Sequence, residues 1–147
     1  MAPSDHDALV DLPRPGAALP VPPFAIEPGE LATYHLTRMS QRLGSGVGRV
    51  PEALMTTCPI ELVVGKAAAA VGRCELLRRF RVEVVGTRKV AALAPVQARR
   101  PIAVEARVEE SSRVAGVVEI AAAIRLRHEA EVASFVLDLK LRPRAGG

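Results

Sequence analysis

The chain has 147 residues and a formal net charge of +4, and 49% of its residues are hydrophobic, which suits one domain with a single core. With three Phe, one Tyr and no Trp, that core has to be aliphatic, and the scattered basic residues lack the aromatic neighbours that nucleic-acid binding uses. No uncharged apolar run is long enough to cross a bilayer, so we expect neither a nucleic-acid nor a membrane partner.

The N-terminal part of the chain predicts little packed structure. Residues 1–22 are rich in proline, alanine and aspartate and have no apolar stretch, which predicts a flexible arm and not a signal peptide. We expect one domain over residues 23–147. Within it, Pro28-Gly29 predicts a turn, Leu31–Met39 predicts a strand because of its threonines and tyrosine, and Leu43–Arg49 predicts a loop because of its three glycines.

The middle of the chain predicts one long helix. Glu61–Leu77 contains four consecutive alanines and no proline, and Pro59 stands just before it, where proline favours a helix start. The segment is nearly apolar, so we expect the helix to be buried on most sides. Gly65 and Gly72 are poor helix formers, and in a buried helix they predict close approach of another backbone.

The last part of the chain predicts antiparallel strands. Apolar and polar residues alternate along three segments, and this period of two indicates strands that are covered on one face. A fourth strand is predicted just before them, closed by a proline. The predicted strands are Thr87–Val96, 102–109, 118–126 and 133–142. One apolar helix followed by this meander gives an α+β protein, and wrapping the sheet around the helix, as in a hot-dog fold, buries both.

Three segments resemble the (3R)-hydroxyacyl-ACP dehydratases of the FabZ/FabA type. GTRKVAALAPV at Gly86–Val96 is similar to the glycine, lysine-valine and closing proline-valine of that family. IELVVGKAAAAVG is similar to its central helix, which begins with the catalytic acid, and Glu61 stands 25 positions before Gly86. FAIEPGEL is similar to the family's opening segment. The resemblance covers residues 12–142 and implies a hot-dog fold that acts on acyl thioesters.

The chain departs from that family where the second catalytic residue should lie. The family carries a histidine in a loop before the helix, but SGVGRVPEALMTTCPIE contains none, and Val47 or Gly48 falls at that place. The family's Pro-Gly-Asp after the closing proline-valine is also replaced here, by Gln97–Arg100. The resemblance therefore implies half of a catalytic pair.

Glu61 is the predicted catalytic residue. The resemblance makes it the acid that protonates the leaving hydroxyl of a 3-hydroxyacyl thioester, which requires a pKa adjusted by an apolar pocket. Its neighbours in sequence are apolar, and a carboxylate buried among them needs a purpose or a partner. The alternative is an acid that stabilises the positive end of the helix dipole. We expect Pro59, Val64 and Gly65 to contact the substrate beside it.

Other residues have weaker claims to a role. Arg99 and Arg100 are predicted to bind the phosphate of phosphopantetheine or acidic side chains of a carrier protein, or else to be a solvated pair. His35 is a candidate base or a structural histidine, His6 falls in the arm, and His128 falls in a polar turn. Cys58, with no histidine beside it, is expected to be a buried apolar residue and not a nucleophile.

These residues leave three hypotheses open. The chain is the carboxylate-bearing subunit of a heterodimeric dehydratase of fatty acid or polyketide biosynthesis, an acyl thioesterase, or a non-catalytic subunit that binds acyl chains. We expect a substrate carried by acyl carrier protein or CoA, no further cofactor and no metal. We also expect a homo- or hetero-oligomer, because an unpaired edge strand is a liability, and a cytoplasmic location, because two cysteines provide no disulfide framework.

Overall fold

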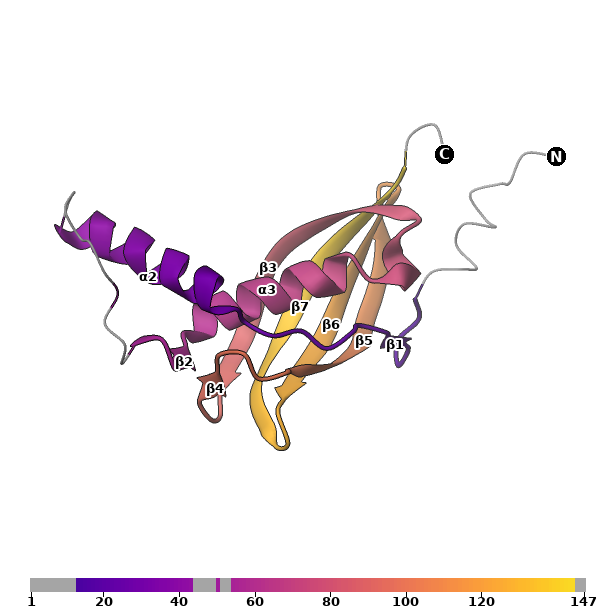
Figure 1. Ribbon diagram of the computed structural model, residues 1–147. Coiled ribbons are helices and arrows are strands. Elements are labelled where there is room, and N and C mark those ends of the chain that lie inside the picture. The colour runs from indigo at the N-terminus through magenta and orange to yellow at the C-terminus, as the bar shows by residue number, and fades with distance from the viewer. Residues whose placement is uncertain (1–12, 44–49, 51–53, 145–147) are drawn as a thin grey trace.

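The computed structural model describes residues 13–43, 50 and 54–144 and is a sheet curved around one helix (Figure 1). The five-stranded antiparallel sheet has the order β1-β5-β6-β7-β3, and a two-stranded ribbon pairs β2 with β4. A 3₁₀ turn, Glu75–Leu77, links α3 to β3. The elements are β1 Ala18–Leu19, α2 Pro28–Leu43, β2 Thr57–Cys58, α3 Ile60–Gly72, β3 Phe80–Ala92, β4 Val96–Gln97, β5 Ala103–Val114, β6 Val117–Arg127 and β7 Glu131–Pro143.

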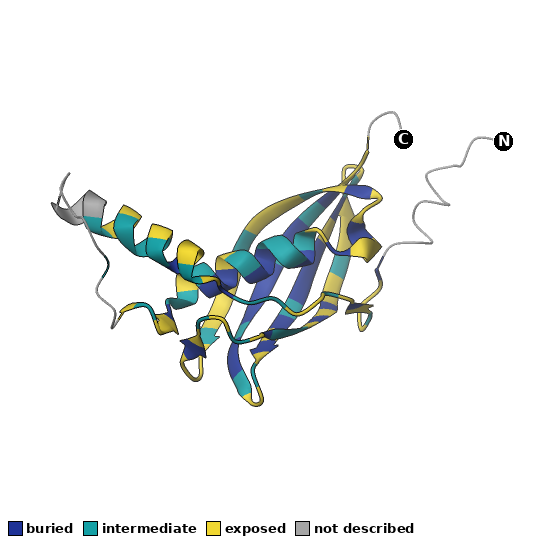
Figure 2. Ribbon diagram, viewed as in Figure 1, coloured by how far each residue is buried: buried dark blue, intermediate teal, exposed yellow. Residues whose placement is uncertain are grey.

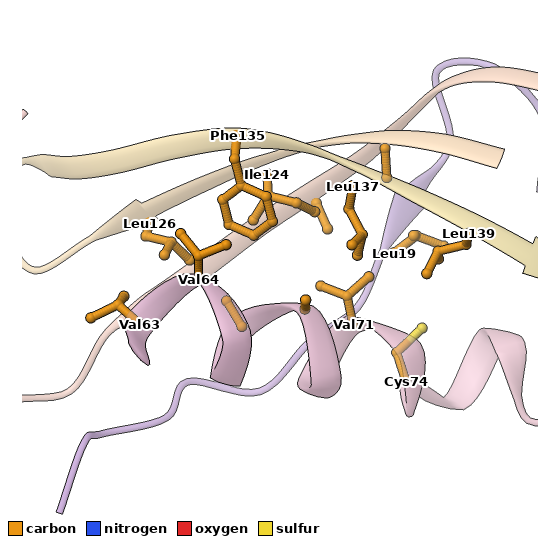
Figure 3. Packing of buried hydrophobic residues seen from close by; sticks show 14 of the residues in the cluster. Leu19, Val63, Val64, Val71, Cys74, Ile124, Leu126, Phe135, Leu137 and Leu139 are labelled. Carbon is orange, nitrogen blue, oxygen red and sulfur yellow. The ribbon is translucent and has the colours of Figure 1, made fainter. Parts of the chain in front are cut away.

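The core lies between α3 and the inner face of the sheet (Figure 2). The buried residues of α3 follow a helical period, so they form one apolar stripe. Figure 3 shows Val64 and Val71 directed at side chains of β6 and β7 such as Phe135 and Leu137. No charged or polar residue in the described part of the chain is fully buried. The predicted α+β hot-dog arrangement, an antiparallel sheet wrapped around one helix, is confirmed.

The three C-terminal strands are confirmed, and the fourth is shifted. β5, β6 and β7 pair in sequence, with their inward side chains alternating as predicted. The strand expected at Thr87–Val96 instead begins at Phe80 and ends at Ala92, because its pairing with β7 continues from Pro143 to Ala133. Val96, the end of the predicted strand, belongs to β4 and pairs with Cys58.

The strand predicted at Leu31–Met39 and the turn predicted at Pro28-Gly29 are wrong, because both lie in α2. Proline suits the first position of a helix, and Glu30 accepts a hydrogen bond from the Glu27 backbone N–H at 2.8 Å, as in a capping box. The threonines that suggested a strand bond back to the helix: Thr33 Oγ1 donates to Gly29 O at 2.9 Å. Local capping therefore outweighs β propensity here.

The packed part of the chain begins earlier than residue 23. Gly16 N–H donates to Val108 O at 2.7 Å, and Leu19 is buried against the core. Of the predicted arm, residues 13–22 are thus packed along β5, and residues 1–12 lie outside the described residues. The loop predicted at Leu43–Arg49 also falls outside them, except for Leu43, which ends α2.

Candidate functional site

A groove of about 750 Å³ lies between α3 and β3, the edge strand of the sheet. One flank of the helix forms one wall, with Ile60, Glu61, Val64, Gly65, Ala68 and Ala69, of which Val64 and Ala68 also belong to the core. Residues 84–87 and Val90 of β3 form the other. All of these helix residues except Glu61 are apolar, and the volume falls in the range of ordinary ligand pockets.

The two glycines of α3 show where the groove opens and where it ends. A Cβ at Gly65 would have no atom within 4 Å, whereas a Cβ at Gly72 would lie 3.5 Å from Val82 Cγ1 and 3.8 Å from Val84 Cγ2. The predicted close approach of another backbone is therefore wrong at both glycines, since Gly72 faces only valine side chains at ordinary contact distance. The expected burial of α3 on most sides is confirmed, with Glu61 and Gly65 exposed along this open flank.

Two irregularities bend β3 along the groove. Its pairing with β7 shifts register between Val84 and Gly86 and again between Arg88 and Ala91. Lys89, in the second of these, has a positive φ of 54°, which costs a side-chain-bearing residue stability. Bulges increase the local twist of a strand and re-aim its side chains. They account for an edge strand that leaves room beside Gly65 and returns to contact at Gly72.

Glu61 stands in the first turn of α3, at the mouth of the groove. Its Oε2 accepts hydrogen bonds from Tyr34 Oη at 2.5 Å and from Arg38 Nη1 at 2.9 Å. Tyr34 and Arg38 are four residues apart on α2, so both face the same way. The Glu61 side chain is 63% exposed, and the expected burial in an apolar pocket is therefore wrong. Its position in α3 also stabilises the helix dipole.

Two side chains of α2 donate hydrogen bonds to this carboxylate. Both of its hydrogen-bonding partners donate to it, and one is a guanidinium, so Glu61 accepts as a carboxylate. Desolvation and the hydrogen bond to Glu61 raise the pKa of Tyr34, which keeps the phenol protonated and a donor at neutral pH. The cluster therefore combines a proton acceptor with a retained proton donor.

A second polar contact fixes α2 on α3. Lys66 Nζ donates to Glu30 Oε2 at 2.6 Å and to Ala25 O at 2.8 Å, one helical turn beyond Glu61. The hydrogen bond from Lys66, followed by that from the Glu27 backbone, lowers the pKa of Glu30. Figure 1 shows α2 projecting beyond the sheet. Its placement beside Glu61 therefore depends on these polar contacts together with Leu31, which is buried in the core.

The structure brings together some of the predicted site residues and separates others. Val64 and Gly65 line the groove with Glu61. Pro59 caps α3, where its carbonyl accepts the backbone N–H of Leu62 at 3.1 Å. Arg99 lines a different hollow, with Met55 and Thr57, and Arg100 pairs with Glu129 at 3.3 Å. Their assignment to phosphate or carrier binding stays a prediction.

Neither His35 nor His128 forms a hydrogen bond with Glu61. His128 Nδ1 lies 3.0 Å from Pro101 O, and its Nε2 accepts the Gln97 backbone N–H at 3.1 Å, so it fastens the β6–β7 turn to the chain before β5. His35 lies on α2, its ring edge-on to Tyr34, with a buried Nε2 that has no hydrogen-bond partner. Among described residues, Glu61 accepts hydrogen bonds from Tyr34 and Arg38 alone. His6 lies outside the described residues.

The cysteine expectation is confirmed in its structural part. Cys58 is buried, and burial raises the pKa of its thiol, which opposes formation of a nucleophilic thiolate. No group of metal-binding side chains occurs among residues 13–43, 50 and 54–144. In that same part of the chain, neither helix has the length and apolar run needed to cross a membrane.

Tyr34 and Arg38 are the site residues that sequence reasoning missed. The sequence predicts a strand over Leu31–Met39, and nothing in that prediction places Tyr34 or Arg38 beside the start of α3. The available signal was the pair Pro28 and Glu30, which marks a helix start and places both residues on one helical face.

Known structures resemble this chain, although no family model and no curated protein sequence matches it. A MaoC-like dehydratase from Rhodospirillum rubrum has a TM-score of 0.67 at 10% identity, over 92% of this chain and 97% of the other. The R-hydratase PhaJ1 from Pseudomonas aeruginosa has a TM-score of 0.60 at 13% identity, over 89% and 83%. A mutant of the fluoroacetyl-CoA-specific thioesterase FlK has a TM-score of 0.58 at 15% identity, over 87% of each chain. At these identities the similarity concerns the fold, and the chain has the hot-dog fold.

Proposed function

We propose that this protein binds acyl thioesters in the α3–β3 groove and uses Glu61 to hydrate or dehydrate them at C2 and C3. The observation that carries the proposal is the Glu61 carboxylate, held by Tyr34 and Arg38 at the mouth of an apolar groove. An apolar groove suits an acyl chain, and a fixed carboxylate at its mouth suits proton transfer at the thioester end. A dehydratase and a hydratase among the similar structures support this choice.

The proton balance assigns a role to Glu61. In hydration of a 2-enoyl thioester, water adds to C3, Glu61 takes the proton that this water loses, and a second group delivers a proton to C2. In dehydration the protonated Glu61 returns its proton to the leaving C3 hydroxyl, and the second group removes the C2 proton. In the hydration direction Glu61 acts as the base, and Tyr34 and Arg38 hold its carboxylate in place.

The group that exchanges the C2 proton is still to be supplied, and this is the reason to propose a partner subunit. No histidine in the described part of the chain lies within hydrogen-bonding distance of Glu61. The groove is bounded by an edge strand, so a second hot-dog subunit against β3 would cover it and could contribute a histidine. We propose this heterodimer, with a carrier-protein-bound or CoA-bound substrate, as the active form.

Thioester hydrolysis is a second candidate. The Glu61 side chain is 63% exposed, so water reaches it, and a carboxylate that activates one water needs no histidine. A thioesterase among the similar structures supports this alternative. In that case the chain would act without a different partner.

One assay separates the two reactions. The tagged chain, purified from its own cells with whatever subunit accompanies it, is given crotonyl-CoA and butyryl-CoA, and loss of the enoyl absorbance and release of free thiol are followed together. We expect enoyl loss without thiol release, and loss of that activity in Glu61→Gln. Glu61-dependent thiol release instead would establish the thioesterase. Equal rates in the wild type and Glu61→Gln would contradict both.

A further inference from the structure

We infer that the α3–β3 groove limits its acyl chain to a medium length, and that Gly72, Val82 and Val84 set the limit. The inference rests on the proposed function in one respect only, that the groove holds an acyl chain. It adds the class of substrate and names the residues that select it. The groove differs along its length, and this difference carries the argument.

The groove is open at Glu61 and closed at Gly72. Beside Gly65 an added Cβ would meet nothing within 4 Å, so helix and strand stand apart there. At Gly72 an added Cβ would touch Val82 and Val84 at ordinary van der Waals distance, so no more than a methyl group fits between helix and strand there. An alkyl chain that starts at Glu61 cannot pass between them at that point.

The spacing along α3 gives the length of the open part. The last helix residue that lines the groove is Ala69, eight residues after Glu61, which at 1.5 Å per residue is about 12 Å. An extended alkyl chain advances a little less than one carbon–carbon bond length per carbon, so this distance holds roughly eight to ten carbons. The groove therefore does not suit long fatty acyl chains.

Small side chains form the floor of the open part. Gly65, Ala68 and Ala69 leave room beside β3, while Val84 and Val90 are 44% and 46% exposed on the facing strand. A mid-helix glycine lowers stability relative to alanine, and Gly65 has no close neighbour that requires it. Room for a chain at this point explains it.

Direct binding of unreactive ligands tests the limit without any catalysis. The probes are S-alkyl pantetheine thioethers, lengthened by two carbons at a time from butyl to tetradecyl, titrated calorimetrically into the purified protein. Each methylene that enters the groove should strengthen binding about fourfold. The gain should stop at roughly eight to ten carbons.

Two variants should change the chain length at which the gain in affinity stops, which we call the break, in opposite directions. Val84→Ala shortens one of the two side chains that close the groove at Gly72, so the limit should move to chains about two carbons longer. Ala69→Leu fills the floor and should move the break to shorter chains. Val114→Ala is the matched control, because Val114 is exposed on β5 and does not line the groove. It should leave the length profile unchanged.

The outcomes distinguish this inference from the proposed function. A break that moves with Val84 and Ala69, in a protein without Glu61-dependent turnover, would support the groove and overturn the proposed reaction. Glu61-dependent turnover with affinity that keeps rising through tetradecyl, or that ignores Val84, would overturn the length limit and leave the reaction standing. No binding at any length would overturn the inference and the acyl groove together.

Discussion

At the scale of one residue, substitution of Gly65 should change stability and ligand binding in opposite directions. Its position is helical and its surroundings are open, so Gly65→Ala should raise the free energy of unfolding by up to about 1 kcal/mol. The same methyl group enters the groove and should weaken binding of an octyl pantetheine thioether. Chemical denaturation and calorimetry on one preparation measure both effects.

Gly116→Ala is the contrasting control for that experiment. Gly116 has a φ of +82°, so alanine there should destabilise the protein by about 1–2 kcal/mol and leave ligand affinity unchanged. If Gly65→Ala were destabilising as well, or bound the thioether as tightly as the wild type, Gly65 would not be a groove residue.

Tyr34 shows what a single donor contributes to the carboxylate. Tyr34→Phe removes the 2.5 Å hydrogen bond to Glu61 and keeps the ring beside His35. A hydrogen bond to a charged group contributes about 1.5–3 kcal/mol, so kcat should fall roughly tenfold to a hundredfold. KM should change little, because Tyr34 does not line the groove. A KM effect with unchanged kcat would place Tyr34 in substrate binding instead.

At the scale of elements, the sequence predicted the strands and the helix that have a repeating hydrophobic pattern, and it misplaced the helix end. The alternation along residues 102–142 predicted β5, β6 and β7 correctly, because a sheet with one covered face imposes a period of two. The apolar stretch after Pro59 predicted α3, although the helix ends at Gly72, where β3 crosses it. The predicted end at Leu77 comes too late, because Glu75–Leu77 form a separate 3₁₀ turn after the helix.

Of the site residues, Glu61 was predicted from the sequence, and its hydrogen-bonding partners were not. Glu61 was predicted from the resemblance, which places it at the position of the family's catalytic acid at a helix start. Its partners Tyr34 and Arg38 are 27 and 23 residues away and face it only because α2 is a helix. Because the sequence predicted a strand in place of α2, neither these partners nor the Lys66–Glu30 contact that places the helix was expected.

Glu30 tests how α2 is held. Its pKa is lowered in the folded protein, so its contribution to stability is present above its ordinary value of 4.5 and is lost as the pH falls through the folded value. Glu30→Gln should lower stability at neutral pH by no more than about 1 kcal/mol, because the pair is partly exposed and screened. The difference from the wild type should vanish in acid.

Denaturant titrations at neutral and acid pH measure that difference. Glu109→Gln, a change of an exposed carboxylate of β5 that forms no ion pair with the described residues, is the control and should be neutral at both. A Glu30→Gln deficit that persists in acid would mean that the contact acts through packing and not through charge.

At the scale of the molecule, β3 is the exposed edge. It ends the sheet order, and Val84, Val85 and Val90 lie on it with 44–55% of their surface exposed. An unpaired apolar edge favours association with another strand. We therefore predict an oligomer, and a monodisperse monomer near 15.6 kDa by light scattering would contradict this.

Lysine substitution locates the contact. Val85→Lys should shift the protein towards monomer, because a charge at an apolar edge opposes strand pairing. Val114→Lys is the matched control, since Val114 is 56% exposed and Val85 is 55% exposed, but Val114 lies on β5, at the opposite side of the sheet from β3. Equal dissociation by both substitutions, or by neither, would mean that β3 is not the interface.

The most direct test of the account is kcat for hydration of crotonyl-CoA by the assembled complex, with wild-type and Glu61→Gln chains. Glutamine keeps the size of the side chain and accepts the same hydrogen bonds from Tyr34 and Arg38, but it cannot take a proton. We predict that kcat falls by about 10²–10⁴, while the melting temperature and the affinity for the octyl thioether stay as in the wild type. Equal kcat values in the two complexes would contradict the account and leave Glu61 as an acid that stabilises the start of α3.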